Sequence, residues 1–295
     1  MTDTTNEFSG SFVAIVTPFT DDDQVDYDAY QHLLNLHLEN GTDGIVVCGT
    51  TGETPTLNRT ESADLIRFTV SYIDKRIPVI AGTGSNSTQQ TIENSLLAES
   101  LGVDALLIAT PYYNKPTQKG LLLHFTEVAN RTALPIIMYN VPGRTGVNMH
   151  PETVLELAKQ DTIIAIKEAS GDLDQIKFIL KHKPADFLVF SGDDALALPV
   201  ISHGGVGCIS VIANEIPDEF STMVKLALSG QNESANEIHS RFARLMELNF
   251  IESNPIPVKT GLFMMGLIKN NFRLPMCTMS DPGPIHKELA RLKLI

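Results

Sequence analysis

The sequence has no tryptophan and only three cysteines in its 295 residues. These cysteines, Cys48, Cys208 and Cys277, are far apart, form no Cys-x-x-Cys pair and have no Cys/His pairing at metal-binding spacing. A disulfide framework and a structural zinc site are therefore not expected, and we predict no bound metal. Sparse, unpaired cysteines are typical of a reducing compartment, so we expect a cytoplasmic protein.

Positive charge is also scarce, with 22 lysines and arginines against 35 acidic residues and a formal net charge of −13. An acidic surface repels nucleic-acid phosphates and anionic membranes, so neither is an expected partner. No apolar run approaches the roughly 20 residues that span a bilayer. The segment from Met1 to Gly10 is polar, so no signal peptide is expected. These absences leave a cytoplasmic enzyme or binding protein.

What the sequence does contain is a series of eight short apolar runs, which start 19 to 33 residues apart. They are rich in β-branched residues and do not alternate with polar residues, as expected for strands of a parallel sheet that is buried on both faces. Amphipathic stretches, such as 60–74, 88–101 and 151–160, lie between them. The predicted strands are 12–17, 44–48, 77–83, 104–109, 134–139, 162–167, 187–191 and 206–211.

Eight strand-helix units predict an α/β protein with a (β/α)₈ TIM barrel. A doubly wound sheet would carry a glycine-rich dinucleotide turn after its first strand, but that strand ends in Thr17-Pro18-Phe19. The sequence also has no GxxxxGK phosphate loop, no GxSxG elbow and no HExxH motif.

The strand pattern stops near residue 225, and helices are predicted at 232–250, 258–270 and 284–293. We therefore expect a barrel over 1–225 that carries the active site, and a C-terminal helical domain over 226–295. This extension either contributes to oligomer assembly or a lid, or only packs against the barrel. The sequence leaves these possibilities open.

Polar residues at the ends of the predicted strands are the candidates for chemistry, because active sites of TIM barrels lie at that face. Lys167 follows the apolar run 162–166 and is expected to be buried. Removal from water favours the uncharged amine, which is a nucleophile toward carbonyl groups. Lys167 is therefore either a Schiff-base lysine or a lysine just past the strand that is exposed or paired with Glu168.

Four further residues have similar alternatives. Tyr139 ends the preceding strand and either moves protons beside Lys167 or is an aromatic residue of the barrel rim. Thr50 and Thr51 lie in a turn flanked by glycines, which either binds a small carboxylate or is an ordinary polar loop. Arg144 either forms a bidentate contact with a carboxylate or is a surface arginine.

Tyr112 and Tyr113 form an aromatic pair, which favours packing at a subunit interface and does not exclude catalysis. None of the eight histidines follows a predicted strand end, and none is assigned a role.

These residues occur in motifs which together resemble the dihydrodipicolinate synthase family of pyruvate-dependent class I aldolase-like lyases. The resemblance covers nearly the whole chain, and some motifs are shared with sibling lyases such as N-acetylneuraminate lyase. The motifs are Gly49-Thr50-Thr51-Gly52-Glu53, Pro111-Tyr112-Tyr113-Asn114-Lys115-Pro116, Tyr139-Asn140-Val141-Pro142-Gly143-Arg144-Thr145-Gly146, Ile166-Lys167-Glu168-Ala169 and Asn254-Pro255-Ile256-Pro257-Val258-Lys259.

The resemblance implies that Lys167 forms an imine with pyruvate and that Tyr139, Thr51 and Tyr113 form a proton relay. Tyr113 would reach in from a neighbouring subunit of a homotetramer, a dimer of tight dimers.

The resemblance also implies contacts with the substrates. Thr50 and Thr51 would hold the pyruvate carboxylate, and Arg144 the carboxylate of aspartate semialdehyde. Gly192 and Ile209 would contact the pyruvyl-lysine through their backbones.

The implied reaction condenses pyruvate with aspartate semialdehyde to 4-hydroxy-tetrahydrodipicolinate, the entry to diaminopimelate and lysine biosynthesis. No cofactor is expected, because the lysine imine itself is the electron sink. A sibling lyase that acts on a sugar acid or a 2-keto-3-deoxy acid would share the lysine chemistry. A barrel that binds small acids without turnover is the remaining alternative.

One departure concerns the cleft in which some family members bind inhibitory lysine. At the corresponding positions this chain has Arg59, Ser62, Asn86, Gln90 and Tyr112. The acidic partner for the ammonium group of the ligand is replaced by the neutral amide of Gln90. Because a charge-assisted hydrogen bond is stronger than a neutral one, we expect weak or absent lysine feedback.

Overall fold

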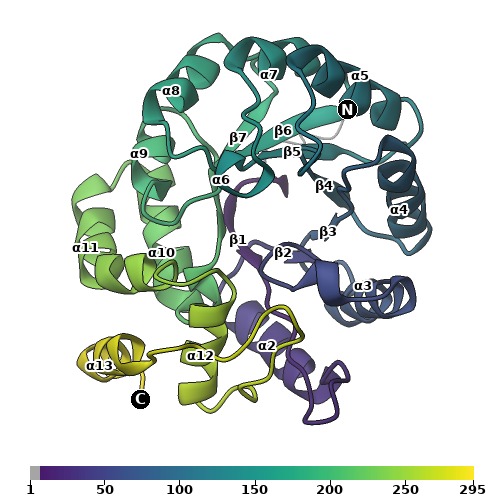
Figure 1. The fold of residues 1–295 in the computed structure, drawn as a ribbon. Helices are drawn as coiled ribbons and strands as arrows, with labels where there is room; N and C mark the ends of the chain where they lie inside the picture. Colours follow the sequence, from purple (N-terminus) through teal and green to yellow (C-terminus); the bar gives the residue numbers. More distant parts are fainter. Residues whose placement is uncertain (1–6) are drawn as a thin grey trace.

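The computed structural model describes residues 7–295. The first six residues, part of the segment in which no signal peptide is expected, lie outside the described residues. Eight parallel strands pair in chain order, and the first pairs with the last, so the sheet closes into a barrel (Figure 1). The strands are β1 (Gly10–Ala14), β2 (Gly44–Val47), β3 (Val79–Gly82), β4 (Ala105–Ala109), β5 (Ile136–Asn140), β6 (Ile163–Glu168), β7 (Leu188–Ser191) and β8 (Gly207–Ser210).

Helices surround this barrel and confirm the predicted TIM architecture (Figure 1). Polar side chains cap the start of several of them, as in α3, where Asn58 and Glu61 form a reciprocal capping box. The α-helices are α2 (Tyr27–Glu39), α3 (Arg59–Ile73), α4 (Thr88–Ser100), α5 (Gln118–Ala129), α6 (Pro142–Thr145), α7 (Pro151–Leu157), α8 (Leu173–His182), α9 (Ala197–Ser202) and α10 (Pro217–Leu228), and the 3₁₀ helices are η1 (Thr54–Thr56) and η2 (Ile212–Asn214).

The first strand starts two residues earlier than predicted and ends at Ala14 rather than at Thr17. Beyond Ala14 the chain is still buried, but it leaves the sheet, because the N–H of Val16 donates to Oδ1 of Asn214 at 3.1 Å. An apolar run therefore overestimates the strand where buried chain continues into a loop.

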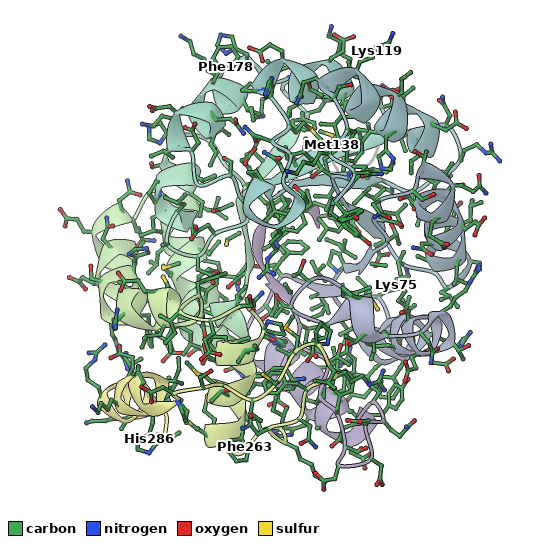
Figure 2. The ribbon with its side chains drawn as sticks, in the orientation of Figure 1. Lys75, Lys119, Met138, Phe178, Phe263 and His286 are labelled. Carbon is green, nitrogen blue, oxygen red and sulfur yellow. The ribbon has the colours of Figure 1, made fainter. Side chains whose placement is uncertain are left out.

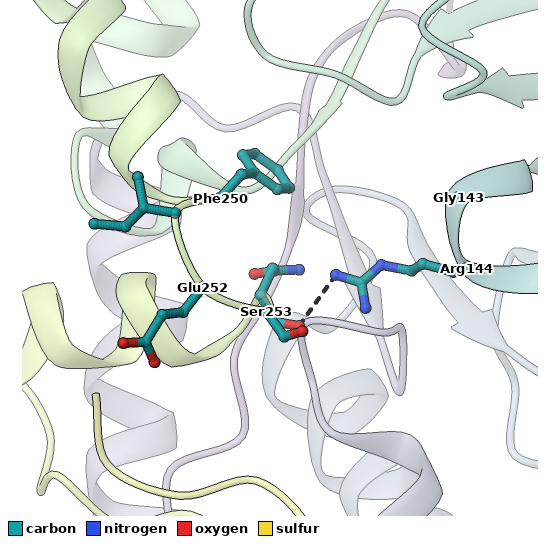
Figure 3. Close-up of a pocket in the computed structure, with 7 residues that line it drawn as sticks. Gly143, Arg144, Phe250, Glu252 and Ser253 are labelled. Atoms are coloured by element: carbon teal, nitrogen blue, oxygen red, sulfur yellow. Dashed lines mark hydrogen bonds between the residues drawn. The ribbon is translucent and has the colours of Figure 1, made fainter. Parts of the chain in front are cut away.

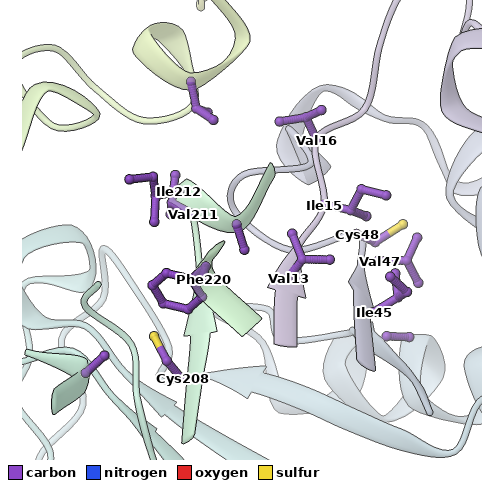
Figure 4. Packing of buried hydrophobic residues seen from close by; sticks show 14 of the residues in the cluster. Val13, Ile15, Val16, Ile45, Val47, Cys48, Cys208, Val211, Ile212 and Phe220 are labelled. Atoms are coloured by element: carbon purple, nitrogen blue, oxygen red, sulfur yellow. The ribbon is translucent and has the colours of Figure 1, made fainter. Parts of the chain in front are cut away.

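The barrel wall separates two apolar cores, because alternate residues of a strand face opposite sides of the sheet. In β5, Ile137 and Tyr139 pack in the inner core, whereas Ile136 and Met138 pack in the outer core beneath the helices. Figure 2 shows Met138 inside the molecule, with Lys119 and His286 at its rim. Side chains of the outer core on β1, β2 and β8 are drawn in Figure 4.

The C-terminal extension contains α11 (Asn232–Leu248), α12 (Ile256–Met264) and α13 (Gly283–Leu292), so three helices follow as predicted. Helix α12 is shorter than predicted, because Gly266 takes a left-handed φ of +75° just after its end. The predicted domain boundary at residue 225 falls inside α10, and that division stays a prediction. Within 7–295, no helix is both long and apolar enough to cross a membrane.

Candidate active site

A cavity of about 760 Å³ opens at the end of the barrel where the strands finish. It is lined by loops that follow several different strands, which is the expected place for a site in this fold. The candidate residues that line it are Thr50, Thr51, Arg59, Ser62, Gln90, Tyr112, Tyr139, Arg144, Lys167 and Gly192. The candidates that do not line it are Asn86, Tyr113 and Ile209.

Lys167 lies within β6 and is 4% exposed. Its Cα is the register partner of Tyr139 on β5, and its Nζ lies 4.4 Å from the centre of the Tyr139 ring. Lys167 forms no ion pair with any carboxylate in residues 7–295. The amine is therefore buried, without a carboxylate partner, and open to the cavity.

Glu168 does not pair with Lys167, so that alternative is wrong. Neighbouring residues of a strand face opposite sides, and the Glu168 carboxylate accepts hydrogen bonds from Asn140, Gln175 and the N–H of Ser170 behind the wall. Burial raises the pKa of Glu168, and these hydrogen bonds oppose the rise. This polar cluster was not predicted from the sequence, although a glutamate inside a buried strand is itself a signal for one.

Gly192 follows β7 and leaves room for the lysine. A Cβ at this position would lie 2.8 Å from Cβ of Ala169 and 3.0 Å from Cε and Cγ of Lys167. A side chain here would therefore occupy space that Lys167 uses.

The loop after β2 is held by its own hydrogen bonds. The N–H of Gly52 donates to the Gly49 carbonyl at 3.1 Å, and the hydroxyl of Thr54 donates to the same carbonyl at 2.8 Å. The hydroxyl of Thr17 donates to the Gly52 carbonyl at 2.7 Å. Between these anchors, the Thr51 side chain is buried at the cavity wall.

Arg144 lies on α6 after β5 and extends over the mouth of the barrel. Its Nη2 donates to the main-chain carbonyl of Asn254 at 3.1 Å, the contact marked by the dashed line in Figure 3. Arg144 and Asn254 also line a second, more open cavity of about 580 Å³, together with Phe250 and Glu252. Arg144 is an exposed residue at the mouth of the barrel.

The two tyrosines have different surroundings. Tyr112 lines the cavity, whereas Tyr113 is 88% exposed and does not. Tyr113 also has a left-handed φ of +73°, which is uncommon for an aromatic residue.

The cavity lining also includes Arg59 and Ser62 of α3 and Gln90 of α4. The Gln90 amide donates to Oδ1 of Asn94 at 2.9 Å. Asn86 lies outside the cavity lining, and its main-chain carbonyl accepts from the Asn114 side chain at 2.8 Å. Ile209 is fully buried on β8 and belongs to the inner core.

A buried ion pair between Lys259 on α12 and Glu53 in the β2 loop was missed by the sequence analysis. Burial lowers the pKa of Lys259 to about 8, although the Glu53 carboxylate opposes this shift. The Lys259 ammonium also lies near the rings of Phe19 and Phe272. Lys259 therefore differs from Lys167, because Lys259 has a carboxylate partner and Lys167 has none in the described chain.

Comparisons with known proteins give a consistent result. The model of the dihydrodipicolinate synthetase family matches residues 7–289. The 4-hydroxy-tetrahydrodipicolinate synthase of Thermodesulfovibrio yellowstonii is 50% identical over 274 residues, which are 93% of this chain and 94% of the relative. That of Parabacteroides distasonis is 48% identical over 90% of both chains. A dihydrodipicolinate synthase of Acinetobacter baumannii, solved with pyruvate, is 42% identical with a TM-score of 0.96 and covers 97% of this chain and 99% of its own.

Proposed function

The chain belongs to the dihydrodipicolinate synthetase family, and from that premise we propose that it is a lyase that condenses pyruvate with aspartate semialdehyde through an imine on Lys167. The observation that carries this proposal is the state of Lys167, an amine that is buried, unpaired with any carboxylate of residues 7–295 and open to the cavity. A lysine amine that faces a cavity without a carboxylate partner is placed to attack a carbonyl carbon.

The reaction begins when Nζ of Lys167 attacks C2 of pyruvate. The carbinolamine that forms loses water and gives an imine, with Tyr139 and Thr51 moving the protons. The imine withdraws electrons from the methyl carbon, so loss of a methyl proton gives an enamine. Thr50 and Thr51 hold the pyruvate carboxylate at the cavity wall.

The enamine then attacks the aldehyde carbon of aspartate semialdehyde, whose carboxylate binds the exposed guanidinium of Arg144. A new carbon–carbon bond forms, and the aldehyde oxygen takes up a proton. The amine of the bound chain next displaces Lys167 from the imine and closes the ring. The product is 4-hydroxy-tetrahydrodipicolinate, the entry to diaminopimelate and lysine biosynthesis, and one water is released overall.

The test is turnover of both substrates, coupled to the next reductase and followed as NADPH loss. We expect a rate that is lost in Lys167→Ala and kept in the control Lys119→Ala, which changes an exposed lysine on α5. Borohydride with pyruvate should label the peptide that contains Lys167. Label on Lys259 would refute the assignment, and an adduct without turnover would point to a sibling lyase.

We also propose that lysine inhibits this enzyme weakly or not at all. The Gln90 amide in the cavity lining is neutral and already bonded to Asn94, so it offers no charge to the ammonium group of free lysine. A titration with L-lysine in the coupled assay should leave the rate nearly unchanged. Strong inhibition below about 1 mM, a roughly 4 kcal/mol interaction, would contradict this proposal.

The assembly that we propose is a homotetramer in the cytoplasm. The support is Tyr113, whose ring is 88% exposed on a left-handed backbone and is thus available to the site of a neighbouring subunit. The three cysteines are unpaired, which suits a reducing compartment. Sedimentation equilibrium should give four chains, and a monomer that turns over at the full rate would exclude a role for Tyr113 in a neighbouring site.

A further inference from the structure

We infer that Asn254 is a positioning residue whose side-chain amide orients the Thr51 hydroxyl for proton transfer. The inference rests on the proposed function. Asn254 lies between α11 and α12, is 5% exposed and lines both cavities. The C-terminal extension therefore contributes directly to the mouth of the barrel.

The position of the Thr51 backbone is fixed without Asn254, because hydrogen bonds within residues 49–54 tie the loop together. These hydrogen bonds do not involve the Thr51 hydroxyl, so they do not fix its orientation. Among residues 7–295, the one hydrogen bond recorded for Thr51 Oγ1 comes from Nδ2 of Asn254 at 3.0 Å. This contact joins positions 203 residues apart in the sequence.

The direction of that hydrogen bond matters for a relay. A threonine hydroxyl has one proton to donate and two lone pairs that accept. Because Asn254 donates, the hydroxyl keeps its own proton for another partner in the cavity. An oxygen acceptor at the place of Nδ2 would take this proton instead and interrupt the transfer.

The Asn254 backbone is held independently of the side chain. Its main-chain carbonyl accepts from Arg144, and five residues later Lys259 pairs with Glu53 in the same loop as Thr51. Oδ1 of Asn254 is buried without a partner among the described residues, so Thr51 is the contact that orients the amide. Substitution of the side chain leaves the Arg144 contact in place and removes the Thr51 contact.

The experiment measures the rate at which wild type and variants form the pyruvate adduct, by borohydride quenching, together with kcat and both KM values. Asn254→Ala should slow adduct formation and kcat roughly 10- to 100-fold, as misplacement of a reacting group does. The KM for aspartate semialdehyde should change less than about threefold, because a main-chain carbonyl still binds Arg144. In a Thr51→Val background, Asn254→Ala should add no more than about a twofold loss.

The nearly isosteric Asn254→Asp is the second variant, and its carboxylate should slow adduct formation at least as much as alanine does. Thermal unfolding of each variant reports on folding. An adduct rate equal to that of the wild type in folded Asn254→Ala or Asn254→Asp would overturn the inference. It would also be overturned if Asn254→Ala slowed adduct formation by the same factor in the wild-type and the Thr51→Val backgrounds. Absence of turnover in the wild type would refute the proposed acceptor alone, since the adduct rate needs only pyruvate.

Discussion

At the scale of single residues, the two fully or nearly buried lysines differ in their partners. Lys259 has a carboxylate partner in Glu53, and Lys167 has none in the described chain. The Lys259 amine is held by its ion pair away from the cavity, whereas Lys167 lines the cavity without a carboxylate partner and is accessible to a carbonyl substrate. The glycine beside Lys167 is part of the same arrangement, because it leaves the side chain its space.

A prediction follows for Gly192→Ala. The added methyl group would lie 2.8 Å from Cβ of Ala169 and 3.0 Å from Cε of Lys167, so both the chain at Ala169 and the lysine side chain have to move. Lys167 should therefore be displaced, and kcat/KM for pyruvate should fall roughly 10- to 100-fold, with thermal unfolding of the variant as the check on its fold.

The matched control is Gly143→Ala in the same mouth of the barrel, where a Cβ would meet nothing within 4 Å. This variant should stay within about twofold of wild type, as a surface change with no lost contact does. A Gly192→Ala enzyme as active as the control would show that Lys167 does not need this space.

At the scale of elements, the loop after β2 and the start of α12 form one unit. Asn254 contacts Thr51, and Lys259 pairs with Glu53, so the site loop is fixed to the extension at two points. Glu53 has a left-handed φ of +53° and also accepts from the N–H of Arg273 at 3.4 Å. The ion pair therefore holds a backbone turn that an isolated loop would rarely adopt.

Removal of one partner of the Lys259–Glu53 ion pair should lower the stability of the fold. Lys259→Met leaves the Glu53 carboxylate buried and uncompensated, which we expect to lower the free energy of unfolding by about 3–5 kcal/mol. The double variant Glu53→Gln with Lys259→Met removes both charges and should recover part of that loss. Urea unfolding of the two variants measures the difference, and a double variant less stable than the single one would contradict this interpretation.

At the scale of the whole molecule, Glu215 lies where the barrel meets the extension. It follows η2 after the last strand, its carboxylate accepts from Asn249 beyond α11 at 2.6 Å, and its Oε1 lies against Gly261 of α12. Burial raises the pKa of Glu215 to about 8. The carboxyl group therefore keeps its proton in the folded protein near neutral pH.

This burial predicts how stability depends on pH. Between about pH 4.5 and 8 the folded chain holds a proton that the unfolded chain has released, so this contribution to the free energy of unfolding falls as pH rises. Glu215→Gln removes the titration, and its stability relative to wild type should increase from pH 5.5 to pH 8.5.

Urea unfolding at both pH values measures this difference. Glu237→Gln, which changes an exposed carboxylate on α11, is the control. An unchanged difference between Glu215→Gln and wild type at the two pH values would show that Glu215 titrates alike in the folded and unfolded chains.

The sequence by itself determined the barrel, because eight apolar runs at regular spacing allow few other arrangements of strands buried on both faces. It also placed Lys167, Tyr139, Thr50 and Thr51 at one face, since the ends of parallel strands meet there. Only the tertiary structure decided which way each side chain points. A continuous apolar run does not distinguish Lys167 facing the cavity from Glu168 facing the helices, because both faces of the strand are buried. The contacts of Asn254 with Thr51 and of Lys259 with Glu53 were likewise decided by the packing of the extension on the barrel. The residues of these two pairs lie 203 and 206 positions apart in the sequence, and no local pattern encodes such a contact.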